Sequence, residues 1–164
     1  MQAKAKKTTA YICRAAAVAA LYVILTEFSA ILGISSGVIQ FRLSEMLCVL
    51  PAFMPAAIPG LAIGCFLSNL LTGCVIWDVI FGTVATLLGA LGAYLLRNHK
   101  LLVPITTIVA NMAIIPFVLR WAYSMPGSIP YFMLTVGIGE IVCCGILGGV
   151  LEFYLMRYGK RLFE

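Results

Sequence analysis

The apolar runs of this chain constrain its fold more than any other feature. Together the runs cover about 10–32, 42–54, 57–72, 75–96, 101–122 and 130–156, the last continuing as a helix to Tyr158, and prolines separate the second from the third. A transmembrane helix needs roughly 20 mostly apolar residues, and a segment in lipid must satisfy its own backbone hydrogen bonds. The pattern therefore predicts an all-α integral membrane protein with six transmembrane helices, of which the second is the shortest.

The composition assigns the whole chain to one membrane domain. Of its 164 residues, 63% are hydrophobic and 10% are charged, whereas about 25% of the residues of a soluble domain are charged. Six helices with short loops use residues 1–164, which leaves no room for a soluble catalytic or nucleotide-binding domain. The sequence also contains no HExxH, GxSxG or GxxxxGK[ST] motif, so we expect a chain that is not itself an enzyme.

The basic residues predict the orientation in the membrane. They cluster before the first helix, between the fourth and fifth, and after the sixth, as Lys4, Lys6, Lys7 and Arg14, then Arg97, His99 and Lys100, then Arg157, Lys160 and Arg161. Six helices place these clusters on one side, which the positive-inside rule makes cytoplasmic. Both termini are then cytoplasmic, and the loops near 33–41, 72–77 and 121–130 are external. The basic start lacks a small-residue cleavage site, so we interpret the first run as a retained helix.

The cysteines do not indicate a metal site. Cys13, Cys48, Cys65, Cys74, Cys143 and Cys144 form no CxxC pair, and nearly all lie inside apolar runs. A metal site needs suitably spaced thiolates with polar support. We therefore expect neither a metal nor a cofactor, and we interpret the cysteines as small buried apolar residues.

Small residues recur four positions apart on several predicted helices. This spacing lets helix backbones approach closely in lipid. It occurs at Ala15-xxx-Ala19, Ala16-xxx-Ala20, Gly60-xxx-Gly64-xxx-Ser68, Gly89-xxx-Ala93 and Gly145-xxx-Gly149. We expect most of these contacts to be internal, and the alanine-rich stretch of the first helix to provide a docking face for another membrane subunit.

Polar residues away from the cytoplasmic ends gather in the external half. The candidates for ligand contact are Gln40, Arg42, Glu45, Asn69, Asp78, Asn111, Trp121, Tyr123 and Glu140. Polar side chains at membrane depth are costly and often functional. Structural roles stay open: Arg42 and Glu45, three residues apart, fit an ion pair on one helical face. The two asparagines fit interhelical hydrogen bonds, and the two aromatic residues fit the membrane interface.

This set of side chains suits a flat heterocycle. A carboxylate can accept two N–H bonds from an amidine-like edge, an amide can complete the donor and acceptor pattern, and aromatic rings can stack on the ligand. Our hypothesis is that Glu45 or Glu140 grips such an edge. Arg42 would orient an acid rather than touch a neutral or cationic ligand.

Three stretches carry a family resemblance. IQFRLSE (39–45), LPAFMPAAIPGLAIGCFLSN (50–69) and WDVIFGTVATLLGA (77–90) resemble the QueT family, the substrate-binding S components of energy-coupling factor (ECF) vitamin transporters assigned to queuosine precursors. The resemblance implies a six-helix S-component fold in the bacterial cell membrane, with a ligand site near the external face. The loop 72–77 (TGCVIW) departs from the more polar loop that we expect there.

The resemblance also implies partners. These are a transmembrane coupling subunit (EcfT) and two cytosolic ATPases, with transport by toppling of the S component in the membrane. An AxxxA motif on the first helix would dock to the coupling subunit, and Ala16 and Ala20 fit it best, although Ala15 and Ala19 also fit. Queuine and the 7-aminomethyl and 7-cyano forms of 7-deazaguanine remain open as ligands.

Other functions remain as alternatives. The chain could be an S component for folate, thiamin or riboflavin, which a ligand panel distinguishes. A membrane enzyme acting on a lipid would need acids, histidines or a nucleophile near the cytoplasmic interface, where this sequence has mainly basic residues. A structural or regulatory subunit would have no reason to gather polar residues in the outer half.

Overall fold

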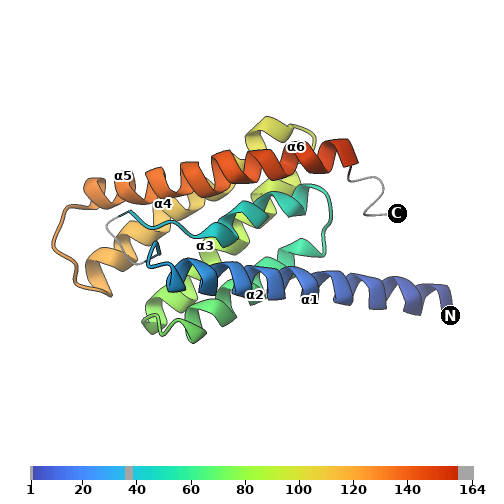
Figure 1. Cartoon of the computed structure of the whole chain (residues 1–164), viewed down its shortest axis with the longest axis horizontal. Helices are drawn as coiled ribbons and strands as arrows, with labels where there is room; N and C mark the ends of the chain where they lie inside the picture. Colours follow the sequence, from blue (N-terminus) through green and yellow to red (C-terminus); the bar gives the residue numbers. More distant parts are fainter. Residues whose placement is uncertain (1, 36–38, 159–164) are drawn as a thin grey trace.

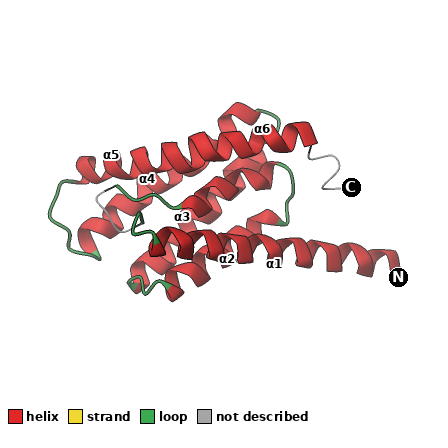
Figure 2. Cartoon of the chain, viewed as in Figure 1, coloured by secondary structure: helices red, strands yellow, loops and turns green. Residues whose placement is uncertain are grey.

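The chain folds into a bundle of six antiparallel segments. The computed structural model describes residues 2–35 and 39–158, and every regular element within them is a helix (Figure 2). The segments are α1 (Gln2–Ile31), the 3₁₀ helix η1 (Leu43–Ala52), α2 (Ala57–Leu71), α3 (Ile76–Leu95), α4 (Val103–Trp121) and a last helix made of α5 (Ile129–Glu140), η3 (Ile141–Leu147) and α6 (Gly148–Tyr158). The predicted all-α bundle of six segments is confirmed, and the chain is a multi-pass membrane protein.

The second and third segments are short. Four helical stretches are long and apolar enough to cross a membrane, whereas Leu43–Ala52 and Ala57–Leu71 are shorter apolar helices. A 3₁₀ helix of ten residues extends about 20 Å at about 2 Å per residue, less than the roughly 30 Å of a bilayer core. Pro51 lies inside η1, and a proline removes a backbone donor. The short second run of the sequence thus becomes a tighter, shorter helix.

The chain termini and the inter-helix turns are divided between the two ends of the bundle. The described chain begins and ends at the same end, where the short turn between α3 and α4 also lies (Figure 1). The three basic clusters that the sequence predicts to be cytoplasmic belong to this end, although Lys160 and Arg161 lie outside the described residues. The opposite end, called the outer end below, holds the turns that follow α1, α2 and α4.

Small residues on α1 and α2 let these helices pack closely. A Cβ added at Gly60 would lie 2.6 Å from the carbonyl oxygen of Ala15, and one at Gly64 would lie 3.0 Å from that of Ala19. Ala15 and Ala19 therefore face the bundle. Ala16 and Ala20, one position further along, are exposed.

The contact between α3 and α4 uses glycine in the same way. A Cβ on Gly89 would lie 2.7 Å from the Thr107 hydroxyl oxygen, and the Thr106 hydroxyl donates to the Gly89 carbonyl at 3.0 Å. Gly145 and Gly149 make no comparably close contact within the described residues. No heavy atom lies within 4 Å of a Cβ built on Gly149, and the nearest to one on Gly145 is at 3.8 Å.

Candidate functional site

A cavity of about 420 Å³ lies at the outer end. It forms where the end of α1, the extended stretch before η1 and the turns after α2 and α4 meet. This outer cavity is lined by Thr26, Ala30, Ser35, Gln40, Arg42, Asn69, Thr72, Cys74, Asp78, Leu119, Tyr123 and Met125. Five of the predicted ligand residues, Gln40, Arg42, Asn69, Asp78 and Tyr123, thus share one space, although they come from four different parts of the chain.

Arg42 organises the polar wall of this cavity. Its guanidinium lies 3.6 Å from Asp78 Oδ2 and donates to the Asn69 side-chain oxygen at 3.3 Å. The Tyr123 hydroxyl donates to the same Asp78 oxygen at 2.9 Å. Burial, and then the adjacent Asp78 carboxylate, raise the pKa of the Tyr123 phenol well above its ordinary value, so this hydroxyl stays a donor at neutral pH.

The second oxygen of Asp78 is buried without a partner. Asp78 is 4% exposed, and its Oδ1 has no hydrogen-bond partner among the described residues. This atom lies 3.5 Å from where a Cβ on Gly82 would be. Glycine at position 82 therefore leaves open the place beside an unsatisfied carboxylate oxygen.

A smaller space, the inner recess, adjoins the outer cavity. It measures about 30 Å³ and is lined by Gln40, Arg42, Glu45, Gly82, Thr86, Asn111, Ile115, Val136 and Glu140. Gln40 and Arg42 line both spaces. The recess contains the predicted ligand residues that are absent from the outer cavity, except Trp121.

Glu140 and Asn111 form one wall of the recess. The Asn111 amide donates to Glu140 Oε1 at 2.7 Å, whereas the buried Oε2 of Glu140 has no partner in the part of the chain that the structure describes. The backbone of Gln40, on the other wall, packs directly against Gly139. A Cβ at position 139 would overlap the carbonyl oxygen of Gln40. The glycine next to Glu140 thus allows the stretch before η1 to pack against α5.

Glu45 is held by neutral donors rather than by Arg42. The Tyr22 hydroxyl donates to Glu45 Oε1 at 2.6 Å, and the Cys48 thiol donates to Oε2 at 3.2 Å. The ion pair between Arg42 and Glu45, left open by the sequence, is not formed, because Arg42 has extended backbone angles (φ −103°, ψ 103°) and precedes the helix. The two side chains therefore do not share a helical face.

The residues of α1 that support Glu45 were not predicted from the sequence. Tyr22 is 1% exposed, the Thr26 hydroxyl donates to Ser44 Oγ at 2.8 Å, and the Leu43 amide donates to Ser29 Oγ at 3.0 Å. Positions 22, 26 and 29 lie on one face of a helix. Hydroxyl groups at this spacing in an apolar run could have predicted a polar face on the first helix.

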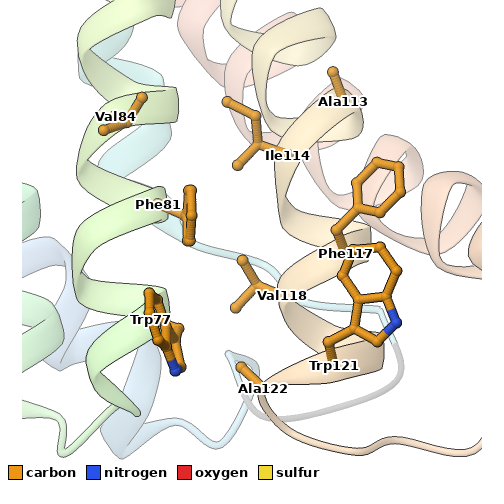
Figure 3. Close-up of a pocket in the computed structure, with 9 residues that line it drawn as sticks. All are labelled: Trp77, Phe81, Val84, Ala113, Ile114, Phe117, Val118, Trp121 and Ala122. Atoms are coloured by element: carbon orange, nitrogen blue, oxygen red, sulfur yellow. The ribbon is translucent and has the colours of Figure 1, made fainter.

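Trp121 lies apart from the other candidates. It is 70% exposed and its ring packs along Phe117, with ring centroids 5.3 Å apart. Both belong to an apolar groove of about 650 Å³ between α3 and α4, lined by Trp77, Phe81, Val84, Ala113, Ile114, Phe117, Val118, Trp121 and Ala122 (Figure 3). Of the two predicted aromatic residues, only Tyr123 lines the polar cavity.

The site offers hydrogen-bonding groups rather than metal ligands. Within residues 2–35 and 39–158, no three His, Cys, Asp or Glu side chains come together in a way that could hold a metal ion. The available groups are carboxylates, amides, hydroxyls and one guanidinium. They suit reversible recognition of a polar molecule.

Comparisons with known proteins agree on one family. A family model described as QueT transporter matches residues 12–157. A relative from Lactococcus lactis subsp. cremoris (strain MG1363), "Queuosine precursor transporter QueT", is 44% identical over 97 residues, which are 58% of this chain and 57% of the relative. The match thus spans somewhat more than half the length of that relative. No solved structure matches.

Proposed function

Because the chain belongs to the QueT transporter family, we propose that it is the substrate-binding subunit of an ECF importer in the bacterial cell membrane. It captures a queuosine precursor, either queuine or a 7-substituted 7-deazaguanine, at the external face. The observation that carries this proposal is the polar cavity of about 420 Å³ in an otherwise apolar bundle, at the end opposite the three basic clusters. The name of the Lactococcus relative, a queuosine precursor transporter, supports the choice of ligand.

The groups in this cavity match a 7-deazaguanine ring. Small-molecule pockets measure roughly 300–1,000 Å³ and combine apolar walls with a few placed polar groups, and the outer cavity lies in this range. Asp78 Oδ1 is a buried acceptor that has no partner among the described residues, and an N–H group of a guanine-like edge would satisfy it. Binding would therefore remove a cost that the unliganded site carries.

The energy for transport would come from partners. We propose that the transmembrane coupling subunit EcfT and two cytosolic ATPases drive toppling of the chain, which carries the site inward. Ala16 and Ala20 lie on the exposed face of α1, whereas Ala15 and Ala19 pack against α2. The exposed pair is therefore the one available to a coupling subunit.

The two alanine pairs provide a matched test of docking. Ala16→Leu places a bulky side chain on the exposed face, so we expect normal ligand binding and loss of co-purification with the ATPase module. Ala15→Leu enlarges a side chain in the α1–α2 contact, and we expect it to lower the free energy of unfolding by about 1–3 kcal/mol. Intact co-purification of Ala16→Leu would exclude this face as the docking surface.

Calorimetry on the purified chain tests the ligand class. Queuine, the 7-aminomethyl and 7-cyano forms of 7-deazaguanine, guanine, riboflavin, thiamin and folate are titrated in turn. We expect binding of 7-deazaguanines alone, and a weakened titration with Asp78→Asn. Heat is the better signal because Trp77 and Trp121 both line the apolar groove, outside the polar cavity. Tight binding of a vitamin instead, or of nothing by a folded sample, would contradict the proposed ligand.

A further inference from the structure

The charges around the site are unbalanced. Three carboxylates, those of Glu45, Asp78 and Glu140, line the two spaces, whereas Arg42 is the one cation among their described lining residues. The ion pair that Arg42 makes is with Asp78. The outer cavity therefore holds a neutralised acid, whereas the two acids of the inner recess have as lining cation only Arg42, which is already paired with Asp78.

The recess acids are held by neutral groups. Tyr22 and Cys48 donate to Glu45, and Asn111 donates to one oxygen of Glu140. The other Glu140 oxygen is buried and has no partner among the described residues. A buried carboxylate without a counter-charge is unfavourable at membrane depth, so the recess favours a positively charged group.

The sizes of the two spaces decide which part of a ligand enters each. A space of about 30 Å³ has room for a group of about the size of a water molecule, such as an ammonium, and not for a fused ring. The ring would need the outer cavity of about 420 Å³. Because Gln40 and Arg42 line both spaces, one molecule can extend from the cavity into the recess.

Asp78 offers the complementary contact for the ring. Its Oδ1, which has no partner among the described residues, lies beside Gly82, and its charge is already balanced by Arg42 at 3.6 Å. An uncharged N–H edge can bond to this oxygen without adding or removing net charge. The neutral and cationic ends of a ligand thus have separate partners.

We infer that the site selects a flat heterocycle bearing a protonated amino group, with the ammonium between Glu45 and Glu140 and the ring against Asp78. This inference rests on the proposed function and makes it more specific. An alkylamine keeps its proton at neutral pH, as lysine does with a pKa near 10.4. The site would therefore prefer a 7-aminomethyl over a 7-cyano substituent on the same ring.

Three ligands that differ at one position test this selection. The purified chain in detergent is titrated with 7-aminomethyl-, 7-hydroxymethyl- and 7-cyano-7-deazaguanine by calorimetry. The hydroxymethyl compound matches the aminomethyl one in size and can also donate a hydrogen bond, but it lacks the charge. We expect the aminomethyl compound to bind about tenfold tighter or more than the hydroxymethyl one, as for a hydrogen bond between charged groups.

Two variants locate the charge recognition. Glu140→Gln keeps the size of the side chain and should reduce the aminomethyl-to-hydroxymethyl affinity ratio to near one. Asp78→Asn should weaken all three compounds to a similar degree and keep the ratio. If Glu140→Gln does not yield a monodisperse sample, Glu45→Gln takes its place with the same expectation.

The possible outcomes separate the inference from the function on which it rests. Equal affinities of the native chain for the aminomethyl and hydroxymethyl compounds would overturn the inference while keeping the proposed function. So would a ratio that is lost in Asp78→Asn and kept in Glu140→Gln. Failure of all three compounds to bind a folded sample would contradict the proposed function itself.

Discussion

The outer end of α4 separates two hollows of different chemistry. Leu119 and Tyr123 line the polar cavity on one side, and Val118, Trp121 and Ala122 line the apolar groove on the other. The groove is larger, about 650 Å³ against about 420 Å³. An apolar surface facing lipid costs little, whereas buried polar groups are costly. In a membrane protein the chemistry of a hollow is therefore a better guide to a candidate ligand site than its size.

The largest effect should follow from breaking the Arg42–Asp78 pair. Arg42→Ala leaves Asp78 buried with only the Tyr123 hydroxyl as a partner, so we expect the free energy of unfolding to fall by about 3 kcal/mol and ligand binding to disappear. Unfolding in mixed micelles measures the first effect and calorimetry the second. The double variant Arg42→Ala/Asp78→Asn should recover part of the stability. A single variant as stable as the native chain would show that this pair does not hold the cavity together.

An intermediate effect should come from two glycines of the last helix. Gly139→Ala brings a methyl group against the Gln40 carbonyl, so we expect the stretch before η1 to shift, with a loss of about 1–3 kcal/mol in stability and weaker ligand binding. Gly149→Ala is the matched control. Because no heavy atom lies within 4 Å of its added methyl group, it should be neutral or stabilising by up to about 1 kcal/mol. Equal behaviour of the two variants would contradict the contact between Gln40 and Gly139.

The smallest effect should come from the groove. Trp121→Ala removes an exposed side chain that does not line the polar cavity, so we expect a stability change within about 0.5 kcal/mol and an affinity change of less than about twofold. The measurement is the calorimetric titration used for the cavity variants. A loss of affinity as large as that of Asp78→Asn would place the ligand in the groove instead.

The sequence predicted where the helical segments lie better than it predicted the type of helix within them. The runs at 75–96 and 101–122 became α3 and α4 with ends shifted by up to two residues, because long apolar segments in lipid have few alternatives to a helix. The run at 42–54 became a 3₁₀ helix, and the last helix contains the π-helical stretch η3 after Glu140. Both helix types depend on contacts with neighbouring helices. The sequence of a single segment does not reveal those contacts.

The candidate site was predicted as a set of residues and not as an arrangement. Eight of the nine predicted ligand residues line the cavity or the recess, because polar side chains are rare in such a chain and each one is informative. Whether they contact a ligand stays a prediction. The partner of Arg42 was not predictable, since Asp78 is 36 positions away in the sequence and only helix packing brings it within 3.6 Å.

Sequence alone determined the membrane class, the six segments and the gathering of polar residues at one end, because the cost of placing charge and unpaired backbone in lipid acts on each segment separately. Only the tertiary structure decided which acid Arg42 neutralises, which alanine pair of α1 stays exposed and which hollow Trp121 lines. These depend on the rotation of each helix about its axis. That rotation is set by close contacts between small residues such as Gly60 and Ala15, and it is a property of pairs of helices rather than of any one of them.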